Sequence, residues 1–115
     1  MTTTGARTIL YPVKDLEKAK ALFTALLGVE PEMDEPYYVG YVVAGQHIGL
    51  DPNGHAKGLT GPSPYWHVDD IEGTCRALLA AGGETVQEIQ DVGGGRRIAS
   101  VRDADGSLLG LLQDP

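Results

Sequence analysis

Cysteine is nearly absent from this sequence, because Cys75 is the only one among 115 residues. A single thiol excludes an internal disulfide and is typical of a protein in a reducing compartment. No apolar run approaches the roughly 20 residues that span a bilayer, and residues 1–10 lack the apolar segment of a secretion signal. We therefore expect a cytoplasmic protein with no membrane partner, in which Cys75 is a buried structural thiol rather than a reactive one.

Basic residues are also scarce, since 9 lysines and arginines stand against 16 acidic residues and give a formal net charge of −7. Nucleic acids and anionic membranes both select proteins with a basic face. Arg96 and Arg97 are adjacent, but they form only a pair. We therefore expect no nucleic-acid partner. The length is that of one ordinary domain, residues 1–115, which can bury roughly two-thirds of its unfolded surface.

Local signals predict an alternation of strands and helices. Asp15 and Asp70 are typical helix N-caps, and the glycines at 28 and 82–83 are typical of helix ends. Helices are predicted over 15–28 and 70–83, and strands over 7–12, 37–43, 46–51, 65–68, 85–89, 97–102 and 107–112. Apolar residues at helical spacing are expected to face the core. They are Leu16, Ala19, Leu22, Phe23 and Leu26 in the first helix, and Ile71, Cys75, Leu78 and Leu79 in the second.

Two predicted turns set the pairing of neighbouring strands. Ala44-Gly45 predicts a two-residue hairpin turn, and residues 103–106 predict a four-residue turn. The resulting cross-strand pairs are Val42 with His47, Ala99 with Gly110, and Arg97 with Leu112. Residues 52–64 are rich in glycine and proline and show no periodicity, so they are predicted to form a linker.

The two halves of the chain repeat one another. At an offset of 55 positions the matched pairs are Val13/Val68, Asp15/Asp70, Leu16/Ile71, Glu17/Glu72 and Gly28/Gly83. Near the ends of the halves the offset is 61, with the pairs Gly45/Gly106, Gly49/Gly110 and Leu50/Leu111. Ordered matches of this kind predict a duplicated unit. Each copy is expected to run strand, helix and then three strands.

The repeated helix start V-x-D-[LI]-E and the closing hairpin D-x-D-G-x-x-x-G-L resemble the vicinal oxygen chelate superfamily, which includes glyoxalase I, bleomycin-resistance proteins and extradiol dioxygenases. The resemblance covers about residues 8–113. It implies an α+β fold in which two tandem βαβββ modules form cupped, largely antiparallel sheets with helices outside. Module one is expected over about 6–54, the linker over about 52–64 and module two over about 62–113. The resemblance also implies a homodimer.

Enzymes of that superfamily usually hold a divalent metal with His, Gln or Glu side chains at four equivalent strand positions. Counted from the shared landmarks, these positions are Thr8, Gly49, Ser63 and Gly110. Glycine has no donor side chain, and neutral hydroxyls bind divalent ions weakly. We therefore predict no metal and no other cofactor, unless a displaced site forms from His47, Asp51 and His67. Each strand glycine indicates either a bulge or close packing against the partner unit, or else a hollow left for a ligand.

Strand alternation predicts which side chains line the cavity implied by the resemblance. The predicted lining comprises Thr8, Leu10, Tyr38, Val42, His47, Gly49, Asp51, Ser63, Tyr65, His67, Arg97, Ala99, Leu108, Gly110 and Leu112. Trp66 and Val68 are expected on the opposite, helix-covered face. A mainly apolar and aromatic surface with a few polar anchors suits a small organic ligand.

His67 is the candidate catalytic residue, because histidine titrates near neutral pH and can act as a general acid or base. The alternative is a structural histidine bonded to Asp69 or Asp70. In the resembled family, the segment matching Gly93–Gly95 is a mobile loop over the cavity mouth, so a lid is one expectation. A phosphate-binding P-loop is excluded because no helix with lysine and serine or threonine follows these glycines.

Three functions stay open on the sequence. The favoured one is a metal-free protein that binds a small organic molecule, similar to the bleomycin-resistance branch that acts by sequestration. The second is an enzyme of lyase, isomerase or dioxygenase type that uses His67 as acid or base, with or without a metal in a displaced site. The third is an interaction module whose cavity is filled by its own side chains.

Overall fold

The structure is a computed structural model that describes residues 2–115, and these residues fall into two compact units. The N-terminal unit comprises Thr8–Ser63. The C-terminal unit comprises residues 64–115 together with residues 2–7. Across residues 2–115 no helix has both the length and the apolar character needed to cross a membrane.

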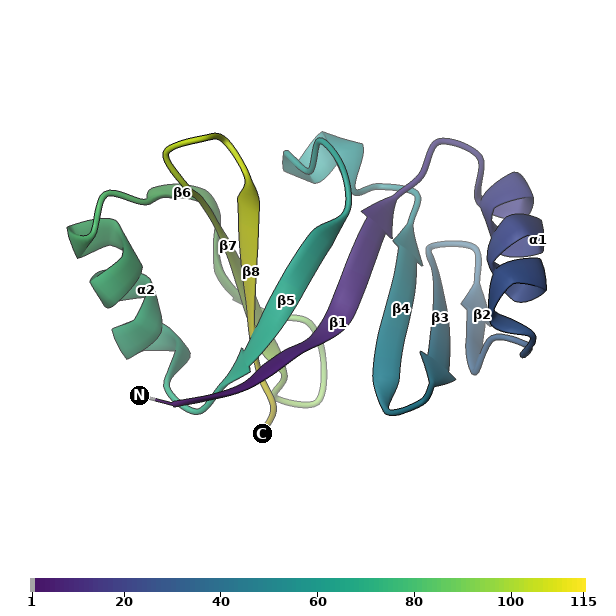
Figure 1. The fold of residues 1–115 in the computed structure, drawn as a ribbon, viewed down its shortest axis with the longest axis horizontal. Helices are drawn as coiled ribbons and strands as arrows, with labels where there is room; N and C mark the ends of the chain where they lie inside the picture. Colours follow the sequence, from purple (N-terminus) through teal and green to yellow (C-terminus); the bar gives the residue numbers. More distant parts are fainter. Residues whose placement is uncertain (1) are drawn as a thin grey trace. The chain divides into compact units, whose positions relative to one another are not determined.

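The N-terminal unit is one complete copy of the predicted repeat. Its elements are β1 (Thr3–Pro12), α1 (Leu16–Leu27), β2 (Met33–Glu35), β3 (Tyr38–Val43) and β4 (Gln46–Asp51), followed by the short 3-10 helix His55–Lys57. The strand order is β2-β3-β4-β1 (Figure 1). β1 runs parallel to β4, while the other neighbours are antiparallel. The first part of β1, Thr3 to Arg7, belongs to the C-terminal unit.

The C-terminal unit repeats the arrangement. Its elements are β5 (Ser63–Val68), α2 (Ile71–Ala80), β6 (Glu84–Asp91), β7 (Arg97–Arg102) and β8 (Leu108–Gln113). The strand order is β5-β8-β7-β6, with β5 parallel to β8 and the other neighbours antiparallel (Figure 1). The predicted α+β class and the two βαβββ copies are confirmed.

The helices begin where the sequence predicts. The Asp15 carboxylate accepts a hydrogen bond from the backbone N–H of Lys18 at 3.1 Å, and the Asp70 carboxylate accepts one from Gly73 at 3.0 Å. These bonds satisfy amides that have no partner inside the helix. α1 ends at Gly28, whose φ of 72° is accessible to glycine at little cost. Asp15 and Asp70 are therefore helix caps in this structure.

α1 packs on the sheet with three of its five predicted residues, and its contact face is turned toward Leu27. Leu16, Ala19, Phe23 and Leu27 contact the buried cluster of Val39, Tyr41, Ile48 and Leu50. Leu22 and Leu26, predicted to face the core, are 68% and 73% exposed. The Tyr41 hydroxyl explains this rotation, because it bonds the Lys20 carbonyl at 3.0 Å and the Thr24 hydroxyl at 2.7 Å. These bonds hold the Lys20–Thr24 side of the helix toward β3.

α2 packs on the second sheet largely as predicted. Ile71, Ala99 and Leu111 form the buried cluster, and Val68, Cys75, Leu78 and Ile89 pack against it. Leu79, also predicted for this face, is 44% exposed. Burial raises the pKa of the Cys75 thiol above its ordinary value, and the nearby Glu88 raises it further. A raised pKa leaves less thiolate at neutral pH, which agrees with a structural role for this cysteine.

The first hairpin has the predicted register. Ala44 and Gly45 form a two-residue turn with φ of 51° and 77°, and Val42 pairs with His47. Turns with two positive φ values match the twist of the flanking strands.

The second hairpin differs from the prediction by one residue. Ser100, not Ala99, pairs with Gly110, and Ile98, not Arg97, pairs with Leu112. The Asp103 carboxylate accepts the N–H of Ser107 at 2.8 Å, so Ser107 belongs to the turn and Arg102 pairs with Leu108. A shift of one residue turns every side chain of a strand to the other face. The prediction that Ala99 and Arg97 face the cavity side was therefore wrong, because Ala99 packs against α2.

The rotation of α1 makes a testable distinction between leucines. Leu50 is fully buried and Leu26 is mostly exposed. We expect Leu50→Ala to lower the free energy of unfolding by about 2–5 kcal/mol through loss of burial and creation of a cavity. Leu26→Ala is expected to change it by less than about 0.5 kcal/mol. Urea unfolding of both variants measures this, and a loss at Leu26 as large as that at Leu50 would show that α1 has the predicted face.

Candidate functional site

The four positions at which the resemblance predicts metal ligands lie within β-strands. Thr8 is in β1 and pairs with His47, and Gly49 is in β4. Ser63 begins β5, and Gly110 is in β8. Thr8 and Ser63 are 7% and 0% exposed.

The space next to Gly49 is taken by two side chains of the same unit. A Cβ atom added at Gly49 would lie 2.8 Å from Cζ of Tyr38 and 2.8 Å from Cδ1 of Leu10. Real Cβ atoms do not approach other atoms this closely. Any longer side chain at this position therefore requires Tyr38 and Leu10 to move.

Gly110 shows the same packing in the C-terminal unit. A Cβ atom added there would lie 2.6 Å from Cγ and Cδ2 of the Tyr65 ring and 2.8 Å from the Pro64 carbonyl oxygen. Tyr65 is the residue paired with Gly110 on β5, and it is 2% exposed. Side chains of the same unit occupy the space beside each glycine, so the structure shows close packing, but within each unit and not against the partner unit as predicted.

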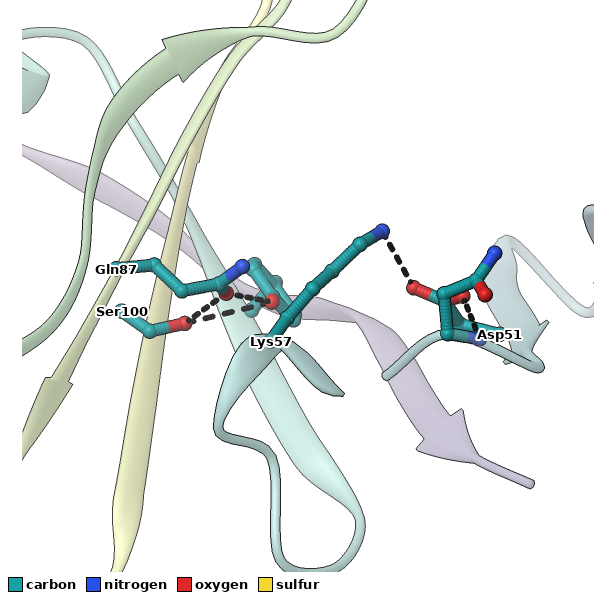
Figure 2. A network of polar contacts seen from close by, with 6 residues as sticks. Asp51, Lys57, Gln87 and Ser100 are labelled. Atoms are coloured by element: carbon teal, nitrogen blue, oxygen red, sulfur yellow. Dashed lines mark hydrogen bonds and ion pairs between the residues drawn. The ribbon is translucent and has the colours of Figure 1, made fainter. Parts of the chain in front are cut away.

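Tyr65 takes part in a polar network with Gln87 and Ser100, the two residues of this network that Figure 2 labels. Its hydroxyl lies 3.4 Å from the Gln87 Oε1 atom and 3.4 Å from the Ser100 Oγ atom. Ser100 Oγ donates a hydrogen bond to the same Gln87 oxygen at 3.0 Å. The sequence named neither Gln87 nor Ser100. A turn of five residues, 103–107, in place of the predicted four would have paired Ser100 with Gly110.

Asp51 holds the start of the linker in the N-terminal unit (Figure 2). Its side chain is 6% exposed and accepts hydrogen bonds from Lys57 Nζ at 2.9 Å and from the Asn53 backbone N–H at 2.8 Å. The carboxylate predicted as a polar anchor of the cavity is therefore engaged in an ion pair and a turn.

His67 has a carboxylate neighbour that differs from the two expected ones. Asp69 accepts hydrogen bonds from the backbone and side chain of Thr2, which lower the pKa of its carboxyl group. Asp70 caps α2. Instead, Oδ2 of Asp114 lies 3.8 Å from Nδ1 of His67. Asp114 follows β8 and belongs to no motif, so nothing in the sequence marks it as functional.

The remaining predicted lining residues follow the register of their strands. His47 and Val42 are exposed neighbours in the N-terminal unit, while Leu108 and Leu112 are buried in the C-terminal unit. Arg97 lies on the α2 side, where its Nη1 atom donates to Oε1 of Glu72 at 2.8 Å.

The donors at the four family positions do not fit a divalent metal, since two are glycines and two are hydroxyls. Among residues 2–115, no three His, Cys, Asp or Glu side chains are grouped so that they could hold a metal ion. The displaced site of His47, Asp51 and His67 would combine residues of both units, and it stays a prediction.

A side chain added at Gly110 is predicted to clash with its neighbours, whereas one added at Gly61 is not. We expect Gly110→Ala to destabilise the protein by about 1–3 kcal/mol, because the added methyl group overpacks the Tyr65 ring. The control is Gly61→Ala, since a Cβ there meets no atom within 4 Å. Thermal or urea unfolding measures both. Equal stabilities of the two variants would mean that Tyr65 does not rest on Gly110.

Comparison with known proteins places the chain in a family. The model of the Glyoxalase/Bleomycin resistance protein/Dioxygenase superfamily matches residues 5–111. A probable lactoylglutathione lyase from Vibrio parahaemolyticus is 33% identical over 117 residues, covering 89% of this chain and 85% of that protein.

Two solved structures share the fold. A glyoxalase/bleomycin resistance protein/dioxygenase superfamily member from Vibrio splendidus has a TM-score of 0.72 and 20% identity, covering 98% of this chain and 100% of that one. The Mn(II)-bound glyoxalase from Novosphingobium aromaticivorans has a TM-score of 0.71 and 18% identity, covering 97% of this chain and 39% of that one.

Proposed function

We propose that this chain, which belongs to the Glyoxalase/Bleomycin resistance protein/Dioxygenase superfamily, is a metal-free protein that binds a small organic molecule. The observation that carries the metal-free part of the proposal is the packing of Tyr38 on Gly49 and of Tyr65 on Gly110. Both glycines stand at positions where metal-dependent members of the resembled superfamily carry ligands. Each is packed against a side chain that a longer residue would displace.

The surroundings of the two glycines favour binding of an organic molecule over binding of an ion. Around Gly110, the uncharged polar groups of Tyr65, Ser100 and Gln87 are bonded to one another, and the apolar Leu108 and Leu112 are buried in the same unit. Apolar surface with a few polar groups is the usual composition of small-molecule sites. Binding without turnover needs no further group, so sequestration is the simplest activity that fits. A cytoplasmic location and a homodimer belong to the same proposal.

Metal analysis tests the proposal. Protein purified without chelators is expected to contain far less than one zinc, nickel, manganese or iron ion per chain by mass spectrometry. Added ions should leave the melting temperature unchanged, because the four positions offer no strong donor. An organic ligand at 100 times its Kd should add about 2.7 kcal/mol of stability in a thermal-shift screen. Stoichiometric metal would refute the proposal.

A second candidate function is that of the Vibrio parahaemolyticus relative, a lyase that acts on lactoylglutathione. Two observations favour it: the 33% identity to that protein and the 3.8 Å separation of His67 Nδ1 from Asp114 Oδ2. A carboxylate next to one ring nitrogen orients a histidine for proton transfer at the other. Under this candidate, His67 is the acid or base.

Formation and cleavage of S-lactoylglutathione, followed in both directions, decide between the two functions. The binding function predicts neither reaction by the wild-type protein. The lyase function predicts turnover that His67→Ala lowers by about 10²–10⁴-fold, as is usual when a general acid or base is removed. His55→Ala is the matched control, because His55 is an exposed histidine of the 3-10 helix. Equal rates for the two variants would exclude His67 from the chemistry.

A further inference from the structure

Three charged side chains meet at one end of the C-terminal unit. Arg96 Nε donates a hydrogen bond to Oδ1 of Asp114 at 2.7 Å. The other oxygen of the same carboxylate, Oδ2, lies 3.8 Å from Nδ1 of His67. One carboxylate therefore lies between a guanidinium and an imidazole that come from different strand ends.

This cluster lies on the face of the unit opposite α2. The neighbours of its members, Arg97 and Gln113, both bind α2: Arg97 donates to Glu72, and Gln113 accepts the N–H of Ile71 at 2.7 Å. Successive side chains of an extended chain point to opposite faces. Arg96 and Asp114 accordingly project to the face of Tyr65 and Gly110, where the proposed ligand is expected.

The glycine run before Arg96 shapes this end of the unit. Gly93, Gly94 and Gly95 have φ values of 118°, 64° and 87°, which side chains rarely allow. The N–H of Arg96 closes the turn on the Gly93 carbonyl at 3.1 Å, and Val92 N–H donates to the Arg96 carbonyl at 2.9 Å. The turn fixes the backbone from which the Arg96 side chain reaches Asp114.

The other carboxylates near this end are engaged elsewhere. Glu72 pairs with Arg97, Asp69 binds Thr2, and Asp91 accepts the N–H of Gly93 at 2.7 Å. Within residues 2–115, Asp114 is thus the carboxylate that faces both Arg96 and His67. The Asp114 and Arg96 side chains are 49% and 41% exposed, and ion pairs with this exposure are weak. Another carboxylate can therefore replace Asp114 at modest cost.

We propose that Arg96 and His67 form a carboxylate-binding subsite, and that Asp114 occupies it as a built-in competitor. The subsite gives the ligand class: a small organic molecule with a carboxylate at one end. The carboxylate of Asp114, which lies beside both Arg96 and His67, shows that a carboxylate fits this subsite. This inference rests on the proposed function, because it names the ligand of the same face.

The test compares benzoate with benzamide, which have similar shapes but differ in charge. Nitrogen-15 NMR titrations of the whole chain should show saturable shifts of the Gly94, Gly95 and Arg96 signals with benzoate and none with benzamide. Asp114→Asn should tighten benzoate binding by roughly two- to fivefold, the range that removal of one exposed ion pair allows. Arg96→Gln should abolish it.

The chain supplies matched controls for both substitutions. Arg97→Gln removes the same charge from the α2 side, and Asp105→Asn removes a carboxylate from the turn after β7; neither should change benzoate binding. Arg96→Lys keeps the charge without the planar fork and should bind with intermediate affinity, which covers the case in which Arg96→Gln does not fold.

Equal shifts with benzamide, or unchanged or weaker benzoate binding in Asp114→Asn, would overturn the subsite. Metal analysis of the same samples distinguishes a failure of the subsite from a failure of the proposed function. Absent metal with failed benzoate binding rejects the subsite alone, whereas stoichiometric metal rejects the metal-free protein itself.

Discussion

The packing of an aromatic ring on a strand glycine is the constraint on which the site depends. Gly49 and Gly110 lack a Cβ, so Tyr38 and Tyr65 can lie against the sheet where a longer residue would stand. Each unit has one such packing, but the rings come from different strands: Leu10 and Tyr65 are the paired residues beside the glycines, and Tyr38 comes from β3. A metal ligand at either glycine would require both a new side chain and the removal of a ring. The packing at each glycine therefore opposes a longer, metal-ligating side chain there, in addition to the missing donor atoms.

The duplicated sequence was sufficient to predict the fold. Caps at Asp15 and Asp70 and the glycine after α1 are local signals, and each acts in the structure as the sequence indicates. The repeat then fixed the order of elements, since one copy of βαβββ predicts the other. The short strand β2 carries no clear signal, because its three residues are all exposed. The rotation of α1 was also hidden, because it depends on hydrogen bonds from Tyr41, a residue distant in sequence.

The candidate site was only partly predictable. The register of the first hairpin followed from its two-residue turn, and it placed Tyr38, His47 and Gly49 on one face correctly. The second hairpin failed because one side-chain bond, from Ser107 N–H to Asp103, lengthens the turn. Because the turn is one residue longer than predicted, Ser100 and Ile98 lie on the site face in place of Ala99 and Arg97. Asp114 has no sequence signal, since its role arises only where strand ends from separate segments meet.

The two proposals describe one site, in which a neutral centre at Tyr65 is followed, two residues along β5, by a charged end at His67. Crystals grown with Mn²⁺ and measured at the manganese absorption edge test the central claim most directly. The account predicts tyrosine rings seated on Gly49 and Gly110 and no anomalous peak within coordination distance of residues 8, 49, 63 or 110. A manganese peak bound at these positions, with either ring displaced from its glycine, would contradict it.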